Sequence, residues 1–280
     1  MQSQTHAQNN EAWSARLELN FDAHAGRSVL AARRHSGPLR VQRPFYPEGE
    51  RVCHVYLLHP PGGVVGGDEL MIDVVVAAGA SALLTTPAAG KFYRSHGAVA
   101  RQAQTLRVEQ GATLEWLPQE SILFDGAHAE LSTRVELAEG AGFIGWEILV
   151  LGRPGAGERF EHGALRQRVE LWQKGKPLYL ERARYEQGAA VLTVPWGLAG
   201  YAVSGSLLCV CNGVELLEQL REAVVPAAGL FSATQLDDVL LCRYLGEHAD
   251  EARQCFETAW QVLRPALLQR PACAPRIWAT

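Results

Sequence analysis

One pattern occurs three times in the chain, as VVVAAGASALLTTP at 74–87, LRVEQGATLEWLP at 106–118 and VELAEGAGFIGWE at 135–147. In each copy an alternating apolar stretch runs into Gly-Ala and continues as a second apolar stretch. Gly79, Gly111 and Gly140 lie 32 and 29 residues apart, and a looser copy, ARYEQGAAVLTVP, has Gly188 a further 48 residues on. A strand–turn–strand unit that recurs in this way predicts stacked β-sheets of β-helix-like topology. The alternative is a set of unrelated tight hairpins, in which Gly-Ala is also common.

The segments on either side support a mainly β fold with a small C-terminal helical part. Residues 13–21 alternate polar and apolar, and residues 52–59 are more apolar, as in a central strand. The last 70 residues differ: a helix is expected at about 214–225, where Pro226 stops it, then a hairpin turning at Asp237 and Asp238. A second helix is expected at about 247–268, with Pro265 kinking it or starting its final turn. We therefore predict a flexible terminus at 1–12 and a single domain at 13–280.

Composition narrows the class of protein. The chain has 280 residues, a net charge of -4, 48% hydrophobic and 20% charged residues, which fits a globular protein and argues against nucleic acid as a partner. No apolar window is long enough to span a membrane, and the N-terminus does not resemble a secretory signal. The six cysteines form no CxxC pair. These features predict a cytoplasmic protein with reduced thiols.

The motifs of common enzymes are missing from the sequence. No Walker A loop, Rossmann fingerprint, G-x-S-x-G elbow or HExxH helix is present, so we expect no hydrolysis of GTP or ATP. A hydrolase with a spatially assembled triad stays open, because triads are not visible in sequence order. Cys209 and Cys211 share one face of a strand and are either a pair of small core residues or soft metal ligands.

Three loops are the best candidates for binding. HPPGGVVGGDEL at 59–70 has two glycine pairs, which permit positive φ and close backbone approach, and we expect Gly66 to need positive φ. TTPAAGKFYRS at 85–95 groups cationic and aromatic side chains as protein interfaces do. WLPQESILFDGA at 116–127 has two carboxylates that fit an acid–base pair, hard-ion ligands or a solvated loop. The candidates are His59, Gly62, Gly63, Gly66, Gly67, Asp68, Glu69, Lys91, Tyr93, Arg94, Glu120 and Asp125.

The second predicted helix has an apolar stripe at i, i+3, i+4 and i+7 spacing, which must be buried somewhere. Phe256, Trp260 and Leu263 lie on this stripe. They face either the core of the domain or a partner protein.

The three loops, together with GWEILVLGRPGAGERF at 145–160 and the ending PRIWAT, resemble the UreD family of urease accessory proteins. The motifs occur in order from residue 57 to 280, and the first is highly specific. One departure is Ala88-Ala89-Gly90, where a more polar run is expected, and it casts doubt on a polar role for that turn.

The resemblance implies a metallocentre-assembly chaperone without catalytic activity. Such a protein binds UreF, which recruits the GTPase UreG, and docks on apo-urease for nickel insertion. It also implies a water-filled passage for nickel in transit, with no tightly bound metal or cofactor. Because a route must release nickel, scattered weak ligands suit it better than a His/Cys cage. The same scatter fits a pure docking scaffold through which no nickel passes, so both alternatives stay open beside the unrecognised hydrolase.

Overall fold

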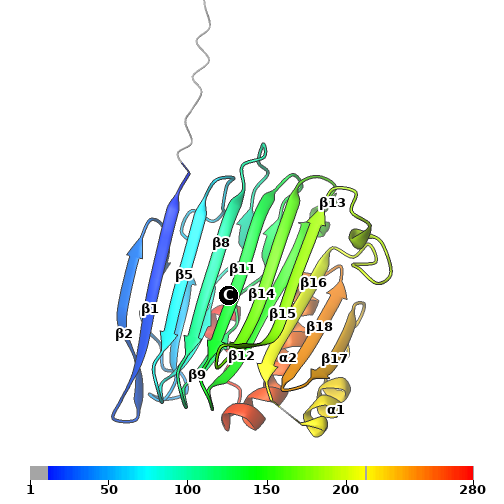
Figure 1. The fold of residues 1–280 in the computed structure, drawn as a ribbon. Coiled ribbons are helices and arrows are strands. Elements are labelled where there is room, and N and C mark those ends of the chain that lie inside the picture. Colours follow the sequence, from blue (N-terminus) through cyan, green and yellow to red (C-terminus); the bar gives the residue numbers. More distant parts are fainter. Residues whose placement is uncertain (1–11, 212, 280) are drawn as a thin grey trace, which may run out of the picture.

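The computed structural model describes residues 12–211 and 213–279, which form two stacked β-sheets and two helices (Figure 1). The 7-stranded first sheet has the order β15 (Lys176–Glu186), β14 (Ala164–Gln173), β11 (His128–Leu137), β8 (Ala100–Val108), β5 (Glu69–Val76), β1 (Ser14–His24) and β2 (Arg27–Ser36). The main path of the second sheet has the order β17 (Leu230–Leu236), β18 (Val239–Gly246), β16 (Val203–Val210), β12 (Gly142–Arg153), β9 (Thr113–Trp116), β6 (Ser81–Thr85), β4 (Cys53–Leu58) and β3 (Arg40–Val41).

Short elements lie beside this path. Strand β10 (Ser121–Leu123) pairs with β12 and with β7 (Gly90–Phe92), and β13 (Glu158–Arg159) pairs with β12. Three 3-10 turns occur at η1 (Pro154–Ala156), η2 (Ala190–Leu192) and η3 (Arg276–Ala279). The predicted flexible segment 1–12 lies, except for Ala12, outside the described residues.

The repeat predicted from the sequence is the coil of a β-helix. Strands β4, β6, β9 and β12 of the second sheet are each followed by a strand of the first sheet, β5, β8, β11 and β14, and neighbouring coils pair in parallel. Glu69 pairs with Arg101, 32 residues on, and Ala100 with Ala129, 29 residues on, so the spacing of the glycines equals the pairing register. The β-helix-like prediction is confirmed.

The glycines of the repeat make the turns from the first sheet to the second. Gly79, Gly111 and Gly140 have φ of +74, +65 and +70, a conformation that favours glycine. Gly188 has φ +69 as well, but it follows β15, which is antiparallel to β14, and leads into η2. The fourth copy therefore shares the turn and does not form a further coil.

Both predicted helices are present, and so is the hairpin between them. Helix α1 (Val214–Ala223) ends before Pro226, and β17 and β18 turn at Asp237, whose φ is +48. Helix α2 (Ala249–Leu268) continues through Pro265, which lies in its last turn. No helix in the described ranges has the length and apolar content that a membrane crossing requires.

Two apolar cores hold the layers together. One fills the space between the sheets, and the other lies between the second sheet and the helices. Phe256, Trp260 and Leu263 of α2 are each 0% exposed and belong to the second core, together with Trp146 of β12. The stripe predicted to face either the core or a partner faces the core.

A buried polar network fastens α2 to the second sheet. The Arg264 guanidinium donates to both oxygens of Glu115 on β9, at 2.8 and 3.0 Å, and to Glu48 at 2.6 Å. The indole of Trp260 also donates to Glu115, at 2.6 Å, and His54 contacts Glu48 at 2.7 Å. Burial opposes the charge on Arg264, but the two carboxylates outweigh it and raise its pKa. Since a buried charge left unpaired is costly, the network fixes the position of the helix.

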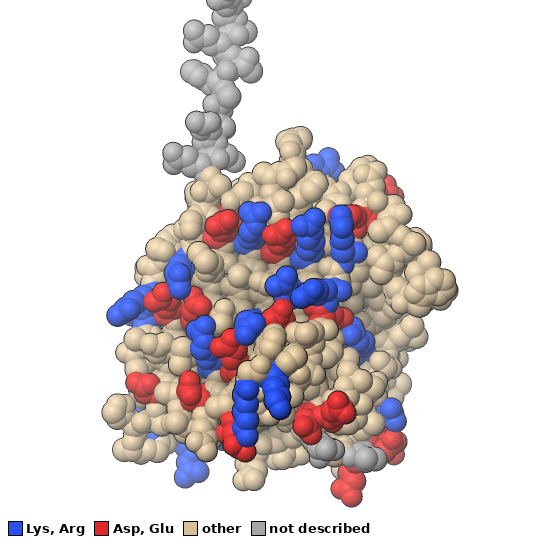
Figure 2. Space-filling view, viewed as in Figure 1, with Lys and Arg blue, Asp and Glu red and all other residues tan. Residues whose placement is uncertain are grey.

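The outer face of the first sheet is a charged, solvated surface (Figure 2). Along one row, Arg101 pairs with Glu69 at 3.5 Å and with Glu130 at 3.1 Å, and Arg166 pairs with Glu130 at 3.3 Å. These side chains are roughly half exposed, so each pair contributes little to stability.

We expect Trp260→Ala to lower the free energy of unfolding by about 3–5 kcal/mol, because it leaves a cavity and removes the donor to Glu115. The control is Trp196→Ala, since Trp196 is 86% exposed and its loss should change stability by less than about 0.5 kcal/mol. Urea unfolding followed by circular dichroism measures both. Equal effects would contradict the core position of Trp260.

Candidate functional site

A cavity of about 500 Å³ lies between the two sheets. Its rim includes the exposed residues Pro60, Gly62, Ala88 and Lys91, so it opens to the surface between two of the predicted loops. Polar groups and apolar side chains both line it. The lining comprises Leu39, 57–60, Gly62, Val64, Leu70, Ile72, 86–91, Gln102, Gln104, Trp116, Pro118, Gln119, Ser121, Leu131 and 147–149.

Three of the predicted residues line this cavity: His59, Gly62 and Lys91. His59 follows β4, and its Nε2 is buried, with no hydrogen-bond partner in the described part of the chain. Burial lowers the pKa of His59, and the charge of Asp68 only partly opposes this. The imidazole is therefore held neutral near pH 7 and offers one ring nitrogen as an acceptor or ligand.

Asp68 organises the glycine loop. Its Oδ1 accepts the backbone N–H of Trp13 at 2.8 Å, and its Oδ2 accepts that of Val65 at 3.0 Å. The carboxylate is 3% exposed and does not line the cavity. Asp68 thus fastens the loop to the start of β1, whereas its neighbour Glu69 lies on the outer face of the first sheet.

The glycines of this loop serve two different purposes. Gly62 and Gly67 have φ of +77 and +97. Gly66 does not have positive φ, so that expectation is wrong: a Cβ there would lie 2.6 Å from the carbonyl oxygen of Ala98. Likewise, a Cβ on Gly63 would lie 2.1 Å from the Tyr93 ring. Close approach of a neighbouring loop, not backbone conformation, requires glycine at these two positions.

The second loop packs against the first and the third. Val64 and Phe92 form a parallel bridge, which brings the exposed side chains of Val65 and Tyr93 to the same rim. The Tyr93 ring meets Phe124 edge-on, with centroids 5.0 Å apart. Lys91 and Arg94 flank this pair, so the rim carries apolar and cationic groups together.

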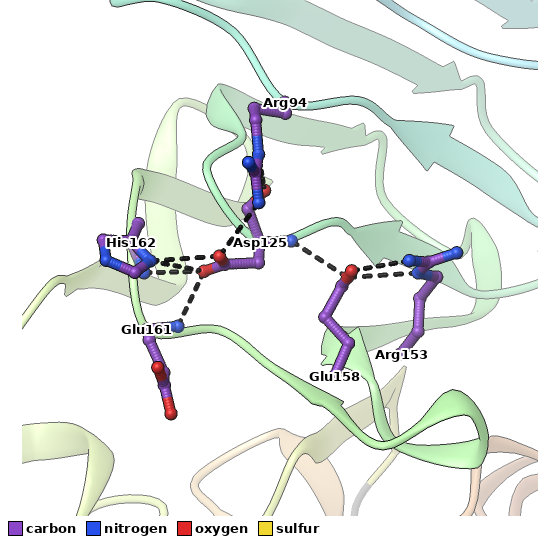
Figure 3. A network of polar contacts seen from close by, with 6 residues as sticks. All are labelled: Arg94, Asp125, Arg153, Glu158, Glu161 and His162. Atoms are coloured by element: carbon purple, nitrogen blue, oxygen red, sulfur yellow. Dashed lines mark hydrogen bonds and ion pairs between the residues drawn. The ribbon is translucent and has the colours of Figure 1, made fainter.

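Asp125 is the centre of a surface network (Figure 3). Its carboxylate accepts the backbone N–H groups of Glu161 at 2.9 Å and His162 at 2.7 Å, and it pairs with Arg94 at 3.2 Å. Its own N–H donates to Glu158, which pairs with Arg153 at 2.6 Å. Burial opposes ionisation of Asp125, but the hydrogen bonds from His162 and Glu161 outweigh it and lower its pKa.

The structure does not join Asp125 and Glu120 as an acid–base pair. Glu120 lies 3.5 Å from Arg253 of α2, whereas Asp125 is held by Arg94 and His162. The two carboxylates have different partners and serve to connect loops to neighbouring elements.

Glu147 of β12 is a candidate site residue that the sequence analysis missed. It lines the cavity from the second sheet, and it accepts hydrogen bonds from Thr133 and, at 2.7 Å, from Gln167 of the first sheet. Burial raises the pKa of Glu147, although both hydrogen bonds favour the charged form. In the sequence, the feature that could have pointed to Glu147 is a single carboxylate inside the otherwise apolar stretch FIGWEILVL.

A row of polar residues leads on from Glu147. Ser206 of β16 is its register partner, and Arg243 of β18 is the register partner of Ser206. Glu147 and Ser206 also line a second void of about 20 Å³. At the end of the row Arg243 pairs with Glu181 at 2.8 Å, and Tyr179 donates to Glu181 at 2.7 Å. Polar groups thus extend from the cavity to the exposed Arg243.

Within the described ranges, His, Cys, Asp and Glu side chains form no group of three or more that could hold a metal ion. The carboxyl, amide and hydroxyl oxygens along the row are separate, weak ligands.

Comparison with known proteins identifies relatives of the whole chain. Residues 14–279 match the family of the UreD urease accessory protein. A urease accessory protein UreD from Azoarcus sp. is 50% identical over 271 residues, 96% of this chain and 94% of that protein. One from Dechloromonas aromatica is 47% identical over 279 residues, 98% and 96% of the two chains, and one from Citrobacter koseri is 46% identical over 270 residues, 96% and 92%.

We expect Asp68→Ala to lower the free energy of unfolding by about 1–3 kcal/mol, because two backbone N–H groups lose their acceptor. Asp73→Ala is the matched control, since Asp73 pairs with Arg16 on the outer face and should change stability by less than about 1 kcal/mol. Urea titrations of the two variants decide this. A loss no greater for Asp68→Ala than for Asp73→Ala would show that the loop does not depend on this carboxylate.

Proposed function

The chain belongs to the UreD family of urease accessory proteins, and on that premise we propose that it receives nickel at the cavity and passes it through its interior to apo-urease. It does so in the cytoplasm, bound to UreF and, through UreF, to UreG. Members of the family are accessory proteins without catalysis, which removes the hydrolase alternative.

The observation that carries the proposal is Glu147, a carboxyl group between the two sheets that lines the open cavity and accepts a hydrogen bond from the first sheet. A carboxyl group placed there costs stability, since burial opposes its charge. A purely structural core gains more from an apolar side chain at such a position. A divalent cation that enters the cavity, in contrast, gains a ligand there, and its arrival favours the ionised carboxylate.

The other groups along the route bind weakly, which suits transfer. Nickel stands near the top of the affinity order for divalent ions, so a dense set of ligands would retain it. The amides of Gln102 and Gln104 line the cavity before Glu147, and Ser206 lies beyond it. The second void, of about 20 Å³, holds roughly one water molecule. Passage at this point therefore requires nickel to lose most of its hydration, or the side chains to move.

The rim of the cavity is the proposed docking surface for a partner protein. Val65 and Tyr93 are 36% and 37% exposed, and Lys91 and Arg94 lie beside them. Interfaces favour aromatic groups together with arginine, and a partner seated on this rim would shield nickel from solvent as it enters.

The remaining alternative is a docking scaffold through which no nickel passes. On that view UreF and UreG bring nickel to urease directly, and Glu147 has a structural role only. The two possibilities differ in what a change at Glu147 does to complexes that are otherwise intact.

We expect Glu147→Gln to reduce nickel-dependent urease activation several-fold, because the anionic ligand is lost, whereas the amide oxygen can still accept from Gln167 and the amide NH2 can donate to the Thr133 hydroxyl. Complexes with UreF, UreG and apo-urease are purified together, and activation is measured per mole of intact complex at fixed nickel and bicarbonate. Glu130→Gln, on the outer face of the first sheet, is the control and should activate normally. Normal activation by Glu147→Gln in intact complexes would favour the scaffold.

The raised pKa of Glu147 also predicts a pH effect on stability. The folded state holds this proton more tightly than the unfolded chain, whose pKa is about 4.5. The contribution to stability is therefore complete below that value and is lost as pH rises through the folded pKa. We expect stability to fall more between pH 5 and pH 8 in the wild type than in Glu147→Gln, as measured by urea unfolding. Parallel pH profiles would contradict the burial of this group.

A further inference from the structure

Two cysteines of the second sheet bring their sulfur atoms close together. Cys209 lies in β16 and Cys211 directly follows the end of that strand, and their Sγ atoms are 3.7 Å apart. Both are free thiols; Cys209 is fully buried and Cys211 is half-buried. Because side chains at i and i+2 project from the same face of a strand, the pair shares one side of the sheet, the side of the core that contains α1 and α2.

A third polar group lies beside this thiol pair. Gln235 of β17 donates from Nε2 to the carbonyl oxygen of Cys211, at 2.7 Å, and to that of Asp237, at 2.6 Å. Its Oε1 is buried and has no hydrogen-bond partner among the residues that the structure describes. Gln235 and Cys209 are both register partners of Leu240, so they lie in one row on the same side of the sheet. An unpartnered buried oxygen is unusual and marks a place where a ligand can bind.

The number of ligands determines which ion fits. Structural zinc takes four protein ligands, and in the described ranges no third His, Cys, Asp or Glu joins the pair to form a metal-binding group. Thiolates select soft ions, and Cu(I) is satisfied by two of them. From this geometry we propose that Cys209 and Cys211 form a binding site for a soft monovalent cation, Cu(I), with Gln235 Oε1 as a further weak contact.

Binding is a ligand exchange without oxidation or reduction. Two Cu–S bonds form, each thiol releases its proton to water, and the ion stays Cu(I) in a complex with one net negative charge. The half-buried side chain of Cys211 can rotate to widen the gap between the sulfurs. Cys242 of β18 is the register partner of Leu207, two residues before Cys209, and within the described ranges it does not join the pair in a metal-binding group.

The first test measures Cu(I) affinity of the reduced full-length chain under anaerobic conditions, in competition with a chromogenic Cu(I) chelator. We expect one Cu(I) per chain, and we expect Cys211→Ser to weaken binding by more than about 100-fold, since loss of an outer partner of a metal site alone costs about 10–100-fold. Cys273→Ser is the matched control, because Cys273 is also half-buried and free. Unchanged binding in Cys211→Ser, or an equal loss in Cys273→Ser, would overturn the proposal.

A second measurement needs no variant and so does not depend on the folding of one. The wild-type chain is treated with iodoacetamide with and without one equivalent of Cu(I), and each cysteine is followed by mass spectrometry. Cu(I) should slow the alkylation of Cys211 and leave that of Cys273 unchanged. Equal rates at Cys211 in the two samples would contradict a copper site at this pair.

Discussion

The parallel pairing of successive coils is the constraint on which the rest of this protein depends. Once the coil length is close to 30 residues, each connection from the second sheet to the first is stacked on the one before it. This is why contacts recur at similar separations: Arg94 with Asp125, Thr86 with Gln119, and Ser95 with His128. The parallel pairing of the strands on either side of each motif loop holds these loops together at one edge of the stack. The cavity is what these loops and the two sheets enclose.

The sequence predicts this architecture well because the repeat is local. Gly79, Gly111 and Gly140 need left-handed backbone at fixed intervals, and that requirement is visible in the order of residues alone. The site was harder to predict. Gly66 is required by the approach of Ala98 from the next coil, which no local pattern reveals. Glu147 looks like one polar residue in a strand until Thr133 and Gln167 are found opposite it. The pairing of Glu115 with Arg264 joins residues 149 positions apart, and only the folded chain brings them together.

The polar groups inside this protein are of two kinds. Arg264 and Glu115 neutralise each other and hold a helix in place, so each removes the cost of burying the other. Glu147 has amide and hydroxyl donors but no ion-pair partner among the described residues, so none of them neutralises its charge. Natural proteins keep such costly groups where function requires them, at the expense of stability. Glu115 therefore belongs to the structural scaffold, because Arg264 keeps it ionised and in place. Glu147 has no such partner in the described residues, so its protonation is free to change.

The first sheet ends at both edges in a strand that runs against its neighbour: β2 is antiparallel to β1, and β15 is antiparallel to β14. A stack of parallel coils presents, at each end, a template on which another copy could continue the ladder. The reversed strand ends the run of parallel coils at each edge, so a second copy stacked there would not continue the parallel register. The coil repeat is thereby interrupted at both edges of this sheet, and the run of parallel coils has the length that the chain itself encodes.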